Sequence, residues 1–389
     1  MKLVLLAAAL LGIPLAAAAS TPGVTATSIL IGGTTPLSGE HAAASASARG
    51  ADAYFRFINA RGGALGRKII YRYLDDGSDP NRTVEAVRRL VEQDRVFALF
   101  NTPGTSTNLA VRSYLNGRKV PQFFVDSSYT GWGREARRYP WTVGFAPTHT
   151  TEATVYGRYL SSTKPGARIA VLYQDDEDGY DLLQGMKRGL GNSRAVVEAT
   201  GFDPRERRVD AHVAELRQTN ATVFMLFCSG KFVSQAFNSA SSLGWRPQVF
   251  VSAASATANR KSVGTISAAF VKDPADPAWT KDPGIKLFRQ VMRAAGLGSP
   301  SNLRNAYYTS GMASAFTLVE TLEKAGANLT RAGALKASAN LNEADNPFLL
   351  PGIVVKAGPG DRFPIEQVQL RRWNGSRWVR FGGLVTAKS

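Results

Sequence analysis

Short apolar runs alternate with helically spaced apolar residues along the first third of the chain. Residues 29–31, 67–74 and 96–100 are runs that strands typically bury. Between them, residues 51–58 and 81–95 carry apolar side chains at the spacing of one helix face. The last run, 96–100, is apolar throughout, which is typical of a strand covered on both faces of a parallel sheet. The pattern predicts a doubly wound α/β unit.

The same alternation begins again after residues 141–145. Strands are expected at 168–173, 195–198, 222–227 and 248–252, separated by helices at 152–160, 180–190, 209–218 and 232–243. This second series predicts a second parallel sheet. Because roughly 370 residues exceed the usual size of one core, we expect two lobes of similar build.

The last part of the chain has a different character. Residues 302–325 have the core spacing of a long helix, and residues 367–373 and 377–381 flank an Asn-Gly-Ser turn sequence, which predicts a hairpin. Trp373 and Trp378 are expected to pack across that hairpin rather than to contact a ligand.

The N-terminus has the pattern of an export signal. Lys2 precedes an apolar run over residues 3–15, which four alanines and Ser20 follow. A membrane anchor is the competing interpretation, but the run is shorter than the roughly 20 residues that span a bilayer and Pro14 interrupts it. We expect residues 1–19 to be a cleaved signal peptide and the mature chain to be periplasmic.

The formal net charge of +17 could indicate a nucleic-acid partner. The basic residues are scattered in short groups, however, and no helix-turn-helix, zinc knuckle or RNP-like strand accompanies them. We therefore expect no nucleic-acid partner and a solvated basic surface with some bias toward anionic ligands. Cys228 is the only cysteine, so no intrachain disulfide can form, and its apolar surroundings favour a buried role.

Two loops rich in hydroxyl groups each follow an apolar strand. Residues 104–108 read Gly-Thr-Ser-Thr-Asn, and residues 126–129 read Asp-Ser-Ser-Tyr. Because the carboxyl ends of parallel strands meet at one edge of a sheet, these hydroxyls and free backbone N–H groups can converge there on a small molecule. The alternative is that the Ser and Thr residues only cap the helices that follow.

An enzyme is the first alternative function. His41, His149 and His212 are too scattered for the spacing of a metal site, and no H-E-x-x-H motif is present. The chain also lacks a G-x-S-x-G elbow and a Walker-type phosphate loop. The acidic run 175–178 lacks the ligand spacing and the glycine of an EF-hand loop. We expect no catalytic residue, no metal and no cofactor.

A series of short motifs occurs in a specific order along the chain. They are Pro36-Leu37-Ser38-Gly39, Asn59-Ala60-Arg61-Gly62-Gly63, Gly66-Arg67-Lys68-Ile69, Asp75-Asp76, Gly104 to Ala110, Pro140-Trp141-Thr142, Leu172-Tyr173-Gln174-Asp175-Asp176, Gly244-Trp245, Asn346-Pro347 and Pro351-Gly352. On these residues the chain resembles the substrate-binding proteins of bacterial ABC importers of the branched-chain amino acid type, over nearly all of its mature length. The resemblance implies a type I periplasmic-binding-protein fold, in which two doubly wound parallel-sheet lobes are joined by a three-crossover hinge.

The resemblance also implies a division of the chain and a way of working. Residues 24–147 and 272–340 are expected in the first lobe, and residues 148–271 and 341–389 in the second. The lobes are expected to close on a ligand by hinge motion and to deliver it, as a monomer, to an inner-membrane ABC permease. A purely sensory protein of the same architecture is the second alternative, because fold alone does not choose between the two roles.

In such proteins, hydroxyls and N–H groups of the first lobe hold the carboxylate of the ligand. By correspondence this role falls to Thr105, Ser106, Thr107, Ser127, Ser128 and Tyr129. A carboxylate that accepts several hydrogen bonds from pre-placed donors needs no salt bridge. Tyr173 and Phe232, together with Tyr129, are candidates to cover an apolar ligand body, and each could equally be a core residue.

The chain departs from the family pattern where the amino group of a ligand would bind. The amino-acid binders place an acidic residue after the strand at 248–251, where this chain has Ser-Ala-Ala-Ser, ending in the candidate contact Ser255. The family's Tyr-Gly pair is replaced by Asp178 and Gly179, and a common aromatic by Ala44.

These departures favour a ligand without an amino group. A buried ammonium without a carboxylate is costly, so an α-amino acid needs Asp126 or Asp178 as a substitute partner. We therefore expect a small carboxylate with an apolar or aromatic body. A branched-chain amino acid or an amide is the alternative.

Overall fold

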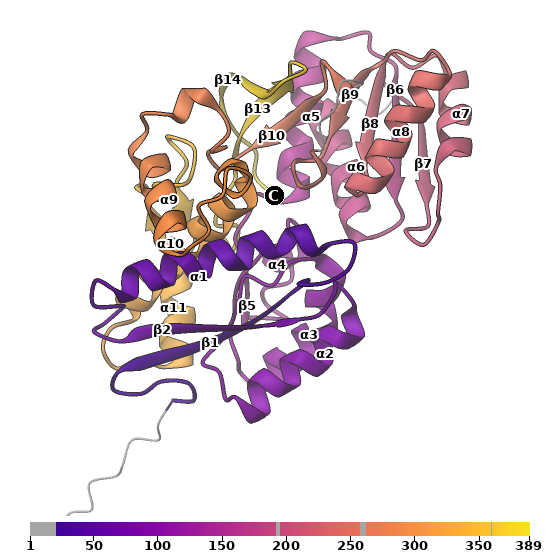
Figure 1. Cartoon of the computed structure of the whole chain (residues 1–389). Coiled ribbons are helices and arrows are strands. Elements are labelled where there is room, and N and C mark those ends of the chain that lie inside the picture. Colours follow the sequence, from indigo (N-terminus) through magenta and orange to yellow (C-terminus); the bar gives the residue numbers. More distant parts are fainter. Residues whose placement is uncertain (1–20, 192–194, 257–261, 359) are drawn as a thin grey trace, which may run out of the picture.

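The computed structural model describes residues 21–191, 195–256, 262–358 and 360–389, so the expected signal peptide at 1–19 lies outside the described residues. The described chain forms two α/β lobes (Figure 1). The N-terminal segments, from indigo to purple, build the first lobe, and the magenta to salmon segments build the second. The orange helices return to the first lobe before the yellow strands complete the second sheet. The chain thus passes between the lobes three times, as the resemblance implies.

The first lobe contains a parallel sheet with the strand order β2-β1-β3-β4-β5. Its strands are β1 (Ser28–Thr35), β2 (Lys68–Asp75), β3 (Leu99–Phe100), β4 (Gln122–Val125) and β5 (Thr142–Gly144). Its helices are α1 (Ser45–Asn59), α2 (Pro80–Arg88), α3 (Thr105–Gly117), α4 (Gly131–Arg134), α9 (Pro283–Ala294), α10 (Ala306–Ala325) and α11 (Arg331–Ser338). One face of the sheet packs on α1, α9 and α10, and the other packs on α2 and α3.

The second lobe contains a mostly parallel sheet with the order β14-β13-β10-β9-β8-β6-β7. Its strands are β6 (Ile169–Gln174), β7 (Val196–Phe202), β8 (Val223–Phe227), β9 (Gln248–Val251), β10 (Ile266–Ala269), β13 (Gln367–Trp373) and β14 (Trp378–Thr386). Its helices are α5 (His149–Thr163), α6 (Glu177–Leu190), α7 (Asp210–Gln218) and α8 (Gly230–Ser242). The α5 and α6 pair covers one face, and α7 and α8 cover the other. The predicted α/β fold with two doubly wound lobes is confirmed.

The third passage between the lobes lies later in the chain than the sequence analysis places it. Leu341, Phe348 and Ile365 are buried in the same core as α1 and α10. The pair β11 (Asn342–Glu343) and β12 (Val355–Lys356) lies in this stretch. Residues 341–358 and 360–365 therefore pack with the first lobe rather than the second. The chain reaches the second lobe at β13, whose Val368 is buried there.

Helix starts are marked by side chains that accept hydrogen bonds from the first turn. Asp79 caps α2 with Pro80 behind it, Thr148 caps α5, and Asp176 caps α6 through the N–H of Gly179 at 2.9 Å. Each cap satisfies backbone donors that a helix cannot bond itself. At α6 this cap holds the first helical turn, which includes Asp178, in place.

The predicted elements appear with shifted ends. The helix predicted at 81–95 consists of α2 followed by a π-helical turn, Arg89–Gln93. Of the apolar run 96–100, only Leu99–Phe100 forms a strand, β3. The hairpin is confirmed, with Trp373 opposite Trp378 and ring centroids 5.7 Å apart. Cys228 is buried, as expected, and burial raises the pKa of its thiol.

Glu343 is a buried carboxyl group in the first lobe. Its Oε1 accepts hydrogen bonds from Thr317 Oγ1 at 2.9 Å and Asn346 Nδ2 at 2.8 Å, whereas its Oε2 has no partner. Burial raises its pKa from 4.5 to about 7, and the two hydrogen bonds oppose this effect only in part. The folded protein therefore holds this proton at a pH where the unfolded chain has lost it.

A raised acid pKa makes the protein less stable as pH increases. The contribution of Glu343 is fully present below about pH 4.5 and is lost as pH rises to about 7. Glu343→Gln keeps the neutral form, so its stability relative to the unmodified protein should increase by up to roughly 3 kcal/mol between pH 4.5 and 8. Urea unfolding at several pH values measures this. Equal pH dependence in both proteins would contradict it, and exposed Glu85→Gln is the control.

Candidate functional site

Two loops of the first lobe lie side by side at the carboxyl ends of β3 and β4. The N–H of Gly104 donates to the carbonyl of Asp126 at 3.2 Å, and the N–H of Asp126 donates to the carbonyl of Thr102 at 3.1 Å. Gly104 has φ 90°, a conformation that other residues rarely adopt, and α3 begins directly after it without a side-chain cap. The first turn of α3 therefore presents uncapped N–H groups beside the second loop.

The hydroxyls of Thr105 and Ser127 meet where these loops join. Their oxygens are 2.7 Å apart. Ser127 Oγ also accepts from the backbone N–H of Tyr129 at 3.2 Å and from Nε1 of Trp132 at 3.0 Å. Because Ser127 already accepts two hydrogen bonds, its own proton remains to be donated to Thr105.

A carboxylate of the second lobe completes this chain of donors. Thr105 Oγ1 lies 2.8 and 3.0 Å from the two carboxylate oxygens of Asp178, which is on the first turn of α6. Thr105 has one proton, which goes to the carboxylate, so it must accept from Ser127. Hydrogen bonds are therefore donated in one direction along this chain: from Trp132 and Tyr129 to Ser127, from Ser127 to Thr105, and from Thr105 to Asp178.

Several charged groups surround Asp178. His149 Nε2 is 3.5 Å from Asp178 Oδ1, and the His149 side chain is buried, with no hydrogen-bond partner for Nδ1 among the described residues. Burial raises the pKa of Asp178, and Asp181 and Glu177 add to this effect. His149 and the hydrogen bond from Thr105 act against it. The site therefore places a costly carboxylate where a cation or hydrogen-bond donors favour it.

Asp181 makes a second contact between the lobes, one turn along α6. Its Oδ2 accepts from the backbone N–H of Thr130 at 2.6 Å, and its Oδ1 is 3.7 Å from Nη2 of Arg134. Thr130 Oγ1 also lies 2.7 Å from Thr150 Oγ1. The first two turns of α6 thus touch both hydroxyl-rich loop regions.

Glu152 contacts the segment after β9, where the amino-acid binders of the family have an acidic residue and this chain has none. Its Oε1 accepts from Tyr156 OH at 2.5 Å and from the backbone N–H of Ala253 at 2.7 Å. Burial raises the pKa of Glu152, which the charge of His149 opposes. The segment after β9 has no acidic side chain of its own, but a carboxylate from α5 contacts its backbone.

The predicted site residues fall into distinct groups. Thr105, Ser127 and Asp178 are brought together, and Ser106 is exposed beside them at the start of α3. Thr107 Oγ1 instead donates back to the carbonyl of Pro103 at 2.7 Å, a bond within its own loop that is neither a ligand contact nor the helix cap that the sequence left open.

The other polar candidates have different partners. Ser128 contributes its carbonyl to the N–H of His149 at 2.7 Å. Tyr129 directs its hydroxyl to Glu135 at 3.0 Å, within the first lobe. Ser255 is half-buried in the short 3-10 turn Ala253–Ser255 after β9.

The two aromatic candidates of the second lobe pack largely against protein. Phe232 is 3 % exposed and meets Phe202 edge to face, with ring centroids 4.8 Å apart. It is a core residue rather than a cover for a ligand. Tyr173 is half-buried against Tyr180 and the backbone of Gly201.

Four residues that contact these groups were not predicted from the sequence: Trp132, His149, Glu152 and Asp181. Trp132 and Asp181 lie three to five positions from predicted residues, so proximity to the loops was an available signal. His149 and Glu152 lie in the first turn of α5, immediately after a passage between the lobes. No local pattern distinguishes such a turn from any other helix start.

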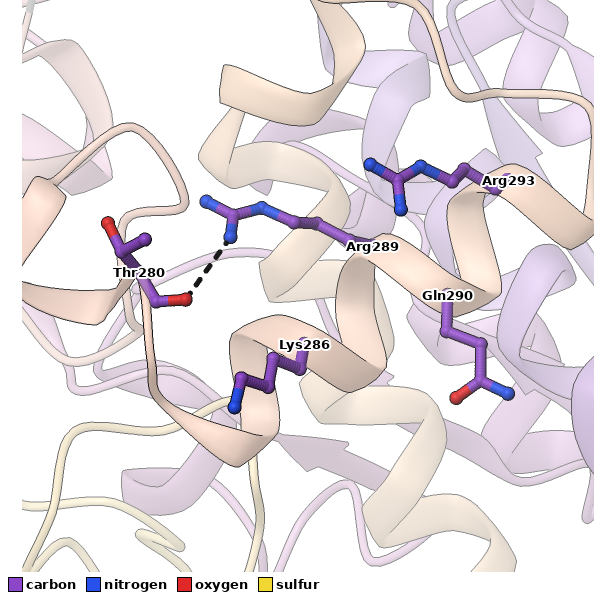
Figure 2. Close-up of a pocket in the computed structure, with 5 residues that line it drawn as sticks. All are labelled: Thr280, Lys286, Arg289, Gln290 and Arg293. Atoms are coloured by element: carbon purple, nitrogen blue, oxygen red, sulfur yellow. Dashed lines mark hydrogen bonds between the residues drawn. The ribbon is translucent and has the colours of Figure 1, made fainter.

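An open depression of about 520 Å³ lies elsewhere, over α9 (Figure 2). Thr280, Lys286, Arg289, Gln290 and Arg293 line it, and Arg289 Nη1 donates to the carbonyl of Thr280 at 3.5 Å. Its basic side chains belong to the exposed face of one helix and include none of the residues that join the lobes. We therefore place the candidate site at the strand ends.

The described residues contain no cluster of three or more His, Cys, Asp or Glu side chains suited to a metal ion. No helix among them is both long enough and apolar enough to cross a membrane.

Comparison with known proteins places this geometry in a family. Residues 28–377 match the family model described as periplasmic binding protein. The chain belongs to the periplasmic binding proteins.

Curated relatives share part of their length with this periplasmic binding protein. The leucine-specific-binding protein of Salmonella typhimurium is 23% identical over 172 residues, which are 44% of this chain and 46% of the relative. The Leu/Ile/Val-binding protein homolog 1 of Brucella abortus is 26% identical over 219 residues, 54% of this chain and 57% of the relative. The chain thus spans about half the length of the curated relatives it matches.

Solved structures share the fold of this periplasmic binding protein over more of its length. A fatty acid ABC transporter substrate-binding protein from Thermomonospora curvata has a TM-score of 0.77 at 19% identity, covering 94% of each chain. A branched-chain amino acid ABC transporter protein from Thermus thermophilus with bound valine has 0.78 at 14%, covering 93% and 97%. A solute binding protein from Rhodopseudomonas palustris with 3,4-dihydroxy benzoic acid has 0.75 at 14%, covering 93% and 98%.

The buried contacts of Glu152 give a test of its structural part in this periplasmic binding protein. Glu152→Ala leaves the Ala253 N–H without its acceptor and removes one of two acceptors of the Tyr156 hydroxyl, the other being the Val251 carbonyl at 3.0 Å. The free energy of unfolding should fall by about 1–3 kcal/mol. Glu152→Gln keeps an acceptor and avoids a buried charge, and it should cost less. Denaturant unfolding at pH 7 measures both. An unchanged stability of Glu152→Ala would show that these hydrogen bonds contribute nothing.

Proposed function

We propose that this protein is an extracytoplasmic solute receptor that binds a small carboxylate between its lobes and delivers it to an ABC importer permease. The observation that carries the proposal is the pair of hydroxyls, Thr105 and Ser127, at the carboxyl ends of β3 and β4 and opposite the second lobe. A ligand at this place contacts both lobes, which is what a closing receptor requires.

The physical fit is that of hydrogen-bond donors to an anion. The Ser127 hydroxyl has two N–H groups donating to it, which orients its proton toward Thr105. The first turn of α3 adds uncapped N–H groups and the positive end of a 13-residue helix. A carboxylate is favoured here without a salt bridge.

An amino acid is a second candidate ligand, and Asp178 is the observation that favours it. Its carboxylate lies at hydrogen-bonding distance from Thr105, where it could pair with the ammonium group of a ligand held by the same hydroxyls. The valine-bound and dihydroxybenzoate-bound proteins of the same fold are examples of the two ligand classes. Support for the two classes from these relatives is equal.

The proposed receptor role also implies a location for the protein and a partner. The leader at 1–19 is proposed to direct export to the periplasm and to be cleaved after Ala19. The mature protein is proposed to act as a monomer without catalysis, docking on an inner-membrane permease in its closed form. Its relatives are substrate-binding proteins, which supports a binding role.

A thermal-shift screen tests the ligand class. Benzoate, cinnamate, 4-methyl-2-oxopentanoate, L-leucine, L-isoleucine and L-valine are the probes, because a ligand that binds only the folded protein raises its Tm. We expect stabilisation by one or more acids that lack an amino group. Stabilisation by the amino acids alone would favour the second candidate, and Tm values unchanged by every probe would count against this site.

Two isosteric substitutions in one helix turn separate ligand binding from a hydrogen bond within the loop before α3. Thr105→Val should weaken binding of the stabilising acid about 10- to 100-fold, because a hydrogen bond to a charged group is lost. Thr107→Val is the matched control, since the Thr107 hydroxyl already donates its proton to the carbonyl of Pro103 at 2.7 Å. Calorimetric titration measures both. Equal losses in the two variants would indicate a general effect on α3 instead.

A further inference from the structure

The contact between Asp178 and Thr105 joins the two lobes through a carboxylate. The residues are 73 positions apart, and they belong to α6 of the second lobe and α3 of the first. The Thr105 hydroxyl lies within 3.0 Å of both oxygens, so no other group fits between these atoms. Asp178 thus accepts the Thr105 hydrogen bond that the carboxylate of the proposed ligand would accept.

One hydroxyl proton cannot serve two carboxylates at once. Ser127 donates to Thr105, and Thr105 donates to Asp178, so the whole donor chain ends on Asp178. A second carboxylate on Thr105 would lie beside that of Asp178, and two like charges so close together repel each other.

The remainder of the α6 surface supports the same closed arrangement. Asp181 accepts from Thr130 N at 2.6 Å and lies 3.7 Å from Arg134. The cap from Asp176 fixes the start of α6, so both carboxylates point to the first lobe from one rigid element. A charge-assisted hydrogen bond between the lobes favours the arrangement in which they touch, so it shifts the balance between open and closed forms toward the closed one.

We propose that Asp178 is an internal competitor for the ligand's carboxylate, which holds the lobes together when no ligand is bound. A ligand must then displace Asp178 from Thr105, so the same residue sets the balance between closure and affinity. The groups that face Asp178 are His149 of α5, Thr105 of α3, and Asp181 and Glu177 of α6. The part that concerns closure is independent of the proposed function, and the part that concerns affinity rests on it.

Lobe separation without ligand is the first test. Nitroxide labels at Glu85→Cys in α2 and Glu215→Cys in α7, both exposed, report the distance between the lobes by double electron–electron resonance. Cys228 is buried and is not expected to react with the label. In the dialysed protein, Asp178→Ala and Thr105→Val should each lengthen and broaden the distance distribution.

The matched control is Glu177→Ala, which removes a carboxylate from the same turn of α6 at an exposed position that makes no hydrogen bond or ion pair with the described residues of the first lobe. Its distance distribution should equal that of the unmodified protein. Circular dichroism and Tm verify that each variant is folded, and Thr105→Val tests the contact from the other lobe if Asp178→Ala does not fold. Distributions that stay unchanged in both variants would overturn the proposal.

Affinity is the second test, with benzoate, 4-methyl-2-oxopentanoate and L-leucine as probes. Asp178→Asn removes the competing charge, so it should bind the two acids about tenfold more tightly than the unmodified protein, a change of about 1.4 kcal/mol. Weaker binding of the acids, or loss of L-leucine binding alone, would show that Asp178 attracts the ligand and would overturn the competition. If no probe binds any variant, the proposed function fails, while the distance measurement still decides the closure contact.

Discussion

Parallel strands need apolar cover on both faces, and this requirement decides where the loops of this protein lie. Strand β8 is buried at every position, and α5, α6, α7 and α8 supply its cover from the two sides. Helices that return the chain over a sheet leave all carboxyl ends of the strands at one edge. The loops after β3 and β4 therefore meet, and α6 begins at the corresponding edge of the second sheet.

Carboxylates wholly or partly withdrawn from water are the costly elements of this arrangement: Glu152 and Glu343 are buried, whereas the side chain of Asp178 is 37 % exposed. Asp178, Glu152 and Glu343 all have their pKa raised by burial. Each accepts hydrogen bonds from hydroxyl, amide or backbone donors, which lowers the cost of the charge without removing it. Their settings nonetheless differ. Glu343 lies inside one core, Glu152 supports the segment after β9, and only Asp178 contacts the opposite lobe.

The site could be predicted in part, and the successes and failures have physical reasons. Thr105 and Ser127 lie immediately after strands, so their place at the sheet edge follows from the alternating pattern. Thr107 has the same chemistry two positions later, but its hydroxyl turns back to a carbonyl of its own loop. Phe232 is one turn into α8 and fills the core beside Phe202. Local sequence does not tell a core aromatic from one in a cleft, because both need the same apolar side chain.

The sequence alone determined the two alternating series, the hairpin and the hydroxyl-rich strand ends, because these depend on residues close together in the chain. It also determined that the segment after β9 has no acid of its own. Only the tertiary structure decided that Asp178 meets Thr105 across 73 positions and that Glu152 meets Ala253 across 101. It also assigned residues 341–358 and 360–365 to the first lobe. These contacts depend on how two separately folded lobes pack and face each other, and no periodicity along one segment encodes that relation.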